Sequence, residues 1–191
     1  DSISLALSSF TELQNVPSER IDSFFEKFAE LIDDDESFGP VLEANRRDVA
    51  SATSRGRATG RLEITSKMRR DMSDGLRMWA SLALQRLERT EVVVHEGWQV
   101  ESWRAPLGVV GFVFEGRPNV FADAMGVLKS GNTVVFRIGS DALETARAIR
   151  DHAMNPAIRA AGLPNNVVSL VDSAERAAGW ALFGDRRLAL A

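Results

Sequence analysis

Residues 105–140 constrain the fold more than any other part of this 191-residue chain. The segment 109–114 is almost entirely apolar, which is typical of a strand buried on both faces of a parallel sheet. After a polar break at 115–119, apolar residues at helical spacing predict a helix over 120–128. A second apolar strand follows at 133–136. The stretch therefore predicts two parallel strands joined by a right-handed helical crossover.

Polar residues follow both predicted strands, at 115–119 and at 137–141. Ligands of open α/β sheets bind outside the carboxyl ends of the strands. We therefore expect these two segments to form a binding site. The usual phosphate fingerprint of three spaced glycines after a first strand is missing, because Gly108 and Gly111 precede or interrupt the strand.

The amino-terminal half is predicted to be helical, with a β-hairpin at its end. Apolar stripes at helical spacing lie at 2–14, 18–32, 40–54 and 68–88, and we expect them to pack as core. The acidic run 33–36 forms either a solvated helix end or a poorly ordered loop, and residues 55–60 form a mobile loop. Residues 91–104 change to strand spacing around a turn at Glu96-Gly97.

The carboxy-terminal part continues the alternation of helices and strands. A helix capped by Ser140 or Asp141 is followed by a kink or break near Asn155, because Pro156 lies inside the helical pattern. A third strand is predicted at 167–171 and a further helix at 174–183. This order indicates an α/β fold with a doubly wound, Rossmann-like parallel sheet. The expected organisation is a helical region 1–90, a hairpin 91–104 and a ligand-binding region 105–191.

Composition and charge exclude several classes of protein. A net charge of −4 argues against a general nucleic-acid binder, because no basic excess exists to neutralise phosphates. We predict no membrane partner, because no apolar run approaches a membrane span and the first residues do not look like a signal peptide; the cytoplasm is the expected location. His95 and His152 have no further histidine or cysteine at ligand spacing, so no metal site is predicted.

Four motifs in order resemble gamma-glutamyl phosphate reductase, also called glutamate-5-semialdehyde dehydrogenase, a family of the aldehyde dehydrogenase superfamily. They are residues 106–111 (PLGVVG), 115–119 (EGRPN), 128–132 (LKSGN), and 162–164 (GLP) followed by 167–172. A weaker match covers 43–48 (EANRRD). The resemblance implies NADPH-dependent reduction of gamma-glutamyl phosphate in proline biosynthesis. It also implies a homo-oligomer formed through the hairpin 91–104.

The resemblance assigns roles to residues at both strand ends. Arg137 matches a basic residue that contacts the adenosine ribose or its 2′-phosphate, which would favour NADPH over NADH, with Gly139, Ser140 and Glu115 beside it. Asn119 matches an oxyanion donor, with Arg117 as the alternate. Structural alternatives stay open: Arg137 paired with Asp141 or Asp172, Asn119 as a helix cap, Glu115 paired with Arg117, and Lys129 at a solvated helix end.

The chain contains no cysteine, whereas this superfamily attacks its substrate with a cysteine thiolate. We therefore expect this chain to be the cofactor-binding piece of a longer enzyme and to be inactive alone. The family usually has Ser or Ala at Gly116 and a second Gly at Ile138, so a different acyl or aldehyde substrate is the first alternative. The second alternative is a non-catalytic nucleotide-binding or oligomerisation module.

Overall fold

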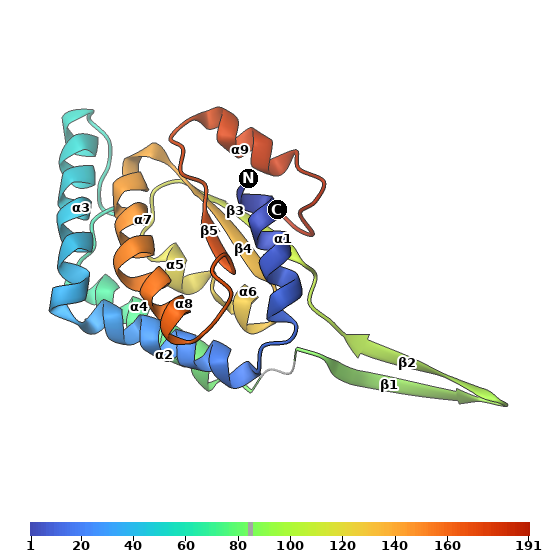
Figure 1. Ribbon diagram of the computed structural model, residues 1–191. Helices are drawn as coiled ribbons and strands as arrows, with labels where there is room; N and C mark the ends of the chain where they lie inside the picture. The colour runs from blue at the N-terminus through green and yellow to red at the C-terminus, as the bar shows by residue number, and fades with distance from the viewer. Residues whose placement is uncertain (84–85) are drawn as a thin grey trace.

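The structure is a computed structural model that describes residues 1–83 and 86–191. Its elements, in chain order, are α1 (Ser2–Leu13), α2 (Ser18–Asp33), α3 (Asp35–Ser54), α4 (Ser66–Ser81), β1 (Glu88–His95), β2 (Trp98–Arg104), β3 (Val109–Phe114), α5 (Val120–Asp123), α6 (Gly126–Lys129), β4 (Thr133–Ile138), η1 (Ser140–Ala142), α7 (Leu143–Ile149), η2 (Arg150–Met154), α8 (Asn155–Ala160), β5 (Val168–Leu170) and α9 (Arg176–Phe183). Figure 1 shows a small sheet enclosed by helices, from which β1 and β2 project as a ribbon.

The central sheet is parallel, with the strand order β3-β4-β5. Strand β3 pairs with β4 over its whole length, from Val109 opposite Thr133 to Phe114 opposite Ile138. On the other side of β3, Leu190 forms an isolated parallel bridge with Val110. The chain therefore runs outward from β3 to β5 and returns through α9 to the opposite side of β3. This is the doubly wound arrangement that the alternation of strands and helices predicts.

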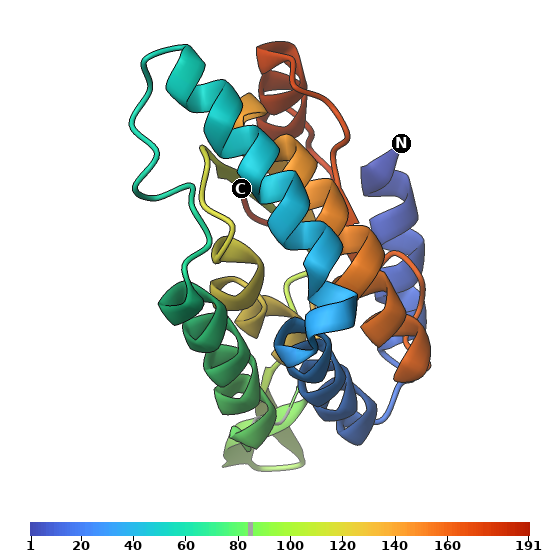
Figure 2. The same cartoon turned by 90° about the vertical axis from the view of Figure 1, so that its left-hand side faces the viewer.

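Helices cover both faces of the sheet. On one face α1 and α9 pack over the sheet, with Ile3, Ala6 and Leu182 against Val109 and Val135. The larger core on the other face joins Phe136 and Val134 to the buried phenylalanines of α2 and to α4 through α8. Figure 2 shows α3 lying alongside α7 on this side. The predicted core stripe of α2 is confirmed, since Phe24, Phe25 and Phe28 are fully buried.

The helix predicted over 68–88 is shorter than expected. It ends at Ser81, and Leu82 is already extended. The chain leaves the helix because Arg86 lies against α1, where its guanidinium donates to the carbonyls of Leu13 and Val16. The part of this prediction that falls on residues 84–85 lies outside the described residues.

The helix predicted over 120–128 is divided into α5 and α6. Gly126 lies at the division, where the ring of Trp79 occupies the space of a side chain. The indole Nε1 of Trp79 donates to the carbonyl of Ala122 at 3.2 Å, an acceptor that a continuous helix would use for Gly126. A tertiary contact therefore replaces the regular hydrogen bond at this point.

Two further helix boundaries lie at the start of α3 and at the start of α8. The acidic run 33–36 is the junction of α2 and α3, and α3 begins at Asp35 because the Asp34 carboxylate accepts from the amide of Ser37 at 2.7 Å. Pro40 therefore lies inside α3 and does not begin it. No break occurs near Asn155, because Met154 and Asn155 both keep helical backbone angles. The helix is instead irregular there: the π-helical segment η2 ends at Met154, and α8 continues from Asn155 with Pro156 in its first turn.

The prediction that Lys129 lies at a solvated helix end is wrong. Its side chain is 4% exposed and pairs with Asp22 of α2, and its Nζ also donates to the carbonyl of Ala80 at 3.2 Å. The end of α6 is covered by α2 and α4, so the ammonium is buried with its counter-ion. A buried charge is tolerated when it is paired and hydrogen-bonded in this way.

The hairpin is confirmed, with β1 and β2 antiparallel and His95 opposite Trp98. Gly97 in the turn has φ +82°, which favours glycine. Among residues 1–83 and 86–191, no helix combines the length and apolar character needed to cross a membrane.

Candidate cofactor-binding site

The carboxyl ends of β3 and β4 border a cavity of about 620 Å³. The strand ends contribute Glu115, Gly116, Arg117, Arg137, Gly139, Ser140 and Asp141 to its lining. The loop after α3 and the beginning of α9 close the cavity from two other sides. The two segments predicted to lie side by side are therefore brought together, at the edge of the sheet where α/β ligands bind.

Gly139 brings the two strand ends together. Its amide donates to the carbonyls of Phe114 at 2.9 Å and of Glu115 at 2.7 Å. A Cβ atom on Gly139 would lie only 2.2 Å from the Glu115 carbonyl oxygen, so no side chain fits here. The amide of Gly139 is already hydrogen-bonded within the protein, so it is not available to a ligand. Gly139 therefore contributes to the shape of the cavity, by letting the two strand ends approach closely.

The cavity is strongly basic. Five arginines line it against two carboxylates, Glu115 and Asp141, which leaves an excess of three positive charges. The arginines are Arg57, Arg61, Arg117, Arg137 and Arg176. Within the described residues only Arg57 of these five forms an ion pair, which joins it to Asp141. The pair predicted as an alternative between Glu115 and Arg117 does not occur, although both residues are described. Such a lining is suited to a ligand with several negative charges.

Arg137 lies half-buried at the end of β4. Its Nη2 donates to the carbonyls of Ala174 and Glu175, both at 3.3 Å, just before α9. Its Nε is buried with no hydrogen-bond partner among the described residues. The backbone of Gly179 approaches the guanidinium, because a Cβ there would lie 3.8 Å from the Arg137 Nε. The guanidinium is thus positioned by backbone contacts, with no carboxylate partner among the described residues.

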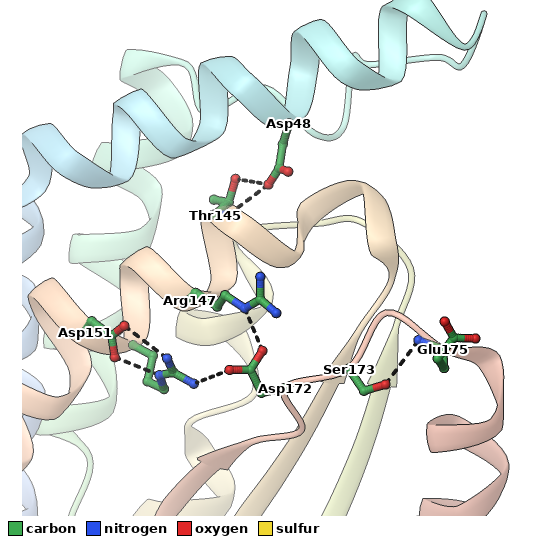
Figure 3. Close-up of polar contacts among 8 residues, drawn as sticks. Asp48, Thr145, Arg147, Asp151, Asp172, Ser173 and Glu175 are labelled. Carbon is green, nitrogen blue, oxygen red and sulfur yellow. Dashed lines mark hydrogen bonds and ion pairs between the residues drawn. The ribbon is translucent and has the colours of Figure 1, made fainter.

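The alternative pairings of Arg137 are wrong, because both acids have other partners. Asp172 accepts from the Nε of Arg147 at 2.6 Å, as Figure 3 shows, and from Arg150 at 3.5 Å. Asp141 is bound by Arg55 and Arg57. The hydrogen bond from Arg57 lowers the pKa of Asp141 below its usual value, with a smaller contribution from Arg55.

Ser140 does not cap the following helix, contrary to prediction. It is exposed and opens the 3₁₀ turn η1, and neither η1 nor α7 has a side-chain cap of its own. Asp48 of α3 supplies this function across the fold, since its carboxylate accepts from the amide of Thr145 at 2.8 Å and from its hydroxyl at 2.7 Å (Figure 3). The free amides of a helix's first turn are stabilised by a negative charge of this kind.

Asn45, one turn before Asp48, holds the loop that borders the cavity. Its amide donates to the carbonyl of Leu62 at 2.8 Å, and its oxygen accepts from the amide of Ile64 at 2.8 Å. Both Asn45 and Asp48 are buried, at 4% and 6% exposure. Buried polar groups of this kind keep a segment in one position only when they are fully bonded. The weakly matching motif 43–48 therefore supports two walls of the cavity.

Asn119 lies outside the basic cavity. It borders a neighbouring cavity of about 430 Å³ that shares Glu115 and Arg117 with the first. Its side-chain amide donates to Asp123 at 2.6 Å and makes no capping hydrogen bond to α5, so the expectation of a cap is wrong. Burial raises the pKa of Asp123 above its usual value. Arg117, the alternate, borders both cavities.

Three arginines of the basic cavity lie outside the segments that the sequence predicts to form the site: Arg57, Arg61 and Arg176. Asp141 lies in the predicted segment 137–141, where the sequence indicates only a helix cap or a partner for Arg137. Arg57 lies in the segment that the sequence predicts as a mobile loop, and only its two arginines and two glycines distinguish that segment. Among the described residues, no group of three or more histidine, cysteine or acidic side chains could hold a metal ion.

No protein-family model matches this chain. Gamma-glutamyl phosphate reductase from Thermotoga maritima is similar in structure, with a TM-score of 0.87 and 28% identity over 95% of this chain and 44% of that one. The same enzyme from Saccharomyces cerevisiae has a TM-score of 0.73 and 20% identity, over 90% and 45% of the two chains.

An engineered glycolyl-CoA reductase with bound NADP⁺ has a TM-score of 0.65 and 16% identity, over 98% of this chain and 40% of that one. An NAD-dependent aldehyde dehydrogenase from Sinorhizobium meliloti has a TM-score of 0.69 and 20% identity, over 98% of this chain and 35% of that one. The chain thus spans less than half the length of each of these proteins. The chain has the α/β fold of these enzymes, and over nearly its whole length it is similar in structure to gamma-glutamyl phosphate reductase.

Proposed function

We propose that this chain is the nicotinamide dinucleotide-binding part of an aldehyde dehydrogenase-like reductase, with NADPH as its cofactor. The observation that carries the proposal is the arginine-lined cavity at the carboxyl ends of β3 and β4. NADPH carries a pyrophosphate and a 2′-phosphate, and the cavity's excess of positive charge suits them. Its volume of about 620 Å³ lies in the usual range for cofactor sites.

Different residues of the cavity bind different parts of the nucleotide. Arg137 binds the 2′-phosphate, since its guanidinium is held by the backbone before α9 and has no carboxylate partner within the described chain. Exposed Ser140 donates a hydroxyl to the same end of the nucleotide, and Glu115 accepts from a ribose hydroxyl. Gly139 contributes only the close approach of the two strands.

NADPH, when bound, supplies the hydride for the reduction. Asn119 serves as the donor to the negatively charged oxygen of the reacting carbonyl, because one of its two amide hydrogens remains after the bond to Asp123. A thiol nucleophile must come from outside these 191 residues, since they contain no cysteine. We propose that the whole enzyme reduces gamma-glutamyl phosphate to glutamate-5-semialdehyde for proline biosynthesis in the cytoplasm.

The division of the chain follows from this role. We propose that residues 1–90 support the nucleotide-binding region 105–191, and that the hairpin 91–104 joins copies of the chain. The departure at Gly116 gives no reason to change the substrate, because a Cβ there would meet its nearest neighbour, the Cβ of Asp141, at 3.9 Å. The serine or alanine of the family would fit the same backbone.

Binding measurements on the purified chain test the proposal. Arg137→Ala should weaken NADPH binding by about tenfold and NADH binding much less, because one charge-assisted contact to the 2′-phosphate is lost. Isothermal titration calorimetry gives both dissociation constants. Arg159→Ala is the matched control, because Arg159 is an exposed arginine of α8 that does not border the cavity.

Equal losses for the two nucleotides would assign Arg137 to structure alone. Failure of the wild type to bind either nucleotide would contradict the proposed function. Turnover of gamma-glutamyl phosphate by this chain alone would contradict the need for an external thiol. The substrate class is tested with a protein that contains both this chain and a thiol nucleophile. Its turnover is measured with acyl phosphates, CoA thioesters and aldehydes.

A further inference from the structure

Asp141 is a carboxylate inside a cavity that otherwise favours anions. It lies four residues after Arg137, in the turn η1, and its Cβ stands over Gly116 at the end of β3. Its side chain is 24% exposed, so it faces the space where a ligand would lie. An acidic residue just beyond a strand of a nucleotide-binding sheet accepts a hydrogen bond from a ribose hydroxyl and repels a phosphate on that ribose.

Two arginines that follow α3 form ion pairs with this carboxylate. The Nη2 of Arg55 lies 2.9 Å from one oxygen, and the Nη1 of Arg57 is bound to the other. Arg55 is held in place, because its Nε donates to the carbonyl of Ser51 at 3.0 Å and its Nη2 to the Ser51 hydroxyl at 3.3 Å. The pairing is therefore built into the end of α3.

The ion pair between Arg57 and Asp141 lies where it can affect ligand binding. Arg57 and Asp141 both line the basic cavity, whereas Arg55 lies behind them. Partly exposed ion pairs contribute little to folding stability, so stability alone does not account for two arginines on one acid. The hydrogen bond that Arg57 donates to Asp141 lowers the pKa of the carboxyl group and raises the pKa of the guanidinium.

We propose that Arg55 and Arg57 are specificity-determining residues, which neutralise Asp141 so that the cavity accepts a ribose carrying a 2′-phosphate. This inference rests on the proposed function, because it concerns the nucleotide that the same cavity binds. With the arginines in place, the carboxylate holds the loop after α3 against η1 and does not oppose the phosphate. Without them, the same carboxylate favours the unphosphorylated ribose.

A double-mutant cycle tests the coupling between Arg57 and Asp141. Dissociation constants are measured for NADPH and NADH, and for the smaller probes adenosine 2′,5′-bisphosphate and AMP, with the purified chain. Arg57→Ala should weaken NADPH and the bisphosphate roughly three- to tenfold, as expected for exposing one nearby like charge, and should change NADH and AMP by less than about twofold. Asp141→Asn should raise NADPH affinity by less than about twofold in the native background, but by roughly three- to tenfold in the Arg57→Ala background.

Arg47→Ala is the matched control. Arg47 forms a comparable ion pair between α3 and α7, with Glu144 at 2.9 Å, but it does not border the cavity, so its loss should change no dissociation constant. Equal effects of Asp141→Asn in the two backgrounds would overturn the inference, while NADPH binding by the wild type would still support the proposed function. If the bisphosphate shows the coupling but NADPH does not bind, the inference stands and the proposed function fails. A wild type that binds none of the four probes would overturn both.

Discussion

Gly139 shows how one residue sets the geometry of the candidate site. It has an ordinary φ of −63°, so the reason for glycine is space and not backbone strain. The carbonyl of Glu115 occupies the place of a side chain and accepts the Gly139 amide at 2.7 Å. The separation of the β3 and β4 ends, and hence the width of the cavity between them, depends on this contact.

Gly139→Ala should therefore destabilise the protein by roughly 2–3 kcal/mol, because the new methyl group forces the two strand ends apart. Denaturant unfolding measures the change. Gly116→Ala is the control, since its Cβ would meet only ordinary contacts near 4 Å, and its effect should stay within about 0.5 kcal/mol. Similar losses for the two variants would show that close packing at Gly139 is not the cause.

Asp48 provides a prediction on pH. Burial raises the pKa of Asp48 above its usual 3.8, against the hydrogen bonds from Thr145 that lower it. The native state thus holds this proton more tightly than the unfolded state does. The contribution of Asp48 to the unfolding free energy therefore falls as pH rises from 3.8 through the raised pKa. Asp48→Asn should remove this fall, which urea unfolding from about pH 2 to about pH 7 would reveal.

Asp185→Asn is the control for this experiment, because its effect has the opposite sign. Hydrogen bonds from Arg187 lower the pKa of Asp185 from 3.8 to about 2. Its contribution is therefore complete above pH 3.8 and is lost as the pH falls toward 2. If the wild type and Asp48→Asn show parallel curves, Asp48 does not titrate differently in the native state.

At the scale of elements, the hairpin of β1 and β2 differs from the rest of the fold. It projects from the body (Figure 1), and apolar side chains are exposed on both of its faces. Val93 and Val100 form an exposed cross-strand pair, at 42% and 46% exposure, and Val94 on the other face is 75% exposed. An isolated two-stranded ribbon is marginally stable in water, so a partner surface is expected to cover it.

The proposed partner is a second copy of the chain. Wild-type protein should sediment as an oligomer, and Val100→Lys should shift it toward the 20.9 kDa monomer, because a charge is placed in the covered surface. Analytical ultracentrifugation over a concentration series measures this. Glu96→Gln at the exposed turn should leave the oligomer unchanged. A wild type that sediments as a monomer at every concentration would contradict the proposal.

At the scale of the whole molecule, local patterns predicted the elements well and distant contacts poorly. The apolar run of β3, the phenylalanine stripe of α2 and the turn at Gly97 depend on neighbouring residues, so the sequence reveals them. The burial of Lys129 depends on Asp22, 107 residues away, and the pairing of Arg57 with Asp141 spans 84 residues. Neither partner has a local pattern that distinguishes it from other exposed charges.

The candidate site could likewise be predicted where it depends on local patterns, and not where it depends on distant contacts. That the ends of β3 and β4 meet could be predicted from two strands and a crossover, and Arg137, Gly139 and Ser140 do border one cavity. The loop arginines and the support from Asn45 and Asp48 could not be predicted, because they come from helices whose position on the sheet the sequence does not specify. The position of Asn119 outside this cavity likewise depends on where α4 packs.

The hydrophobic cluster that α1 and α9 share over the sheet has a consequence for how the protein is made. Ile3 and Ala6 share a hydrophobic cluster with Val109, Val135 and Leu182. The apolar face of α1 therefore waits for Leu182, about 176 residues after Ala6, before this cluster is complete. At 5–20 residues per second this wait lasts roughly 10–35 s. During that time the apolar face of α1 is open to chaperones and to other nascent chains.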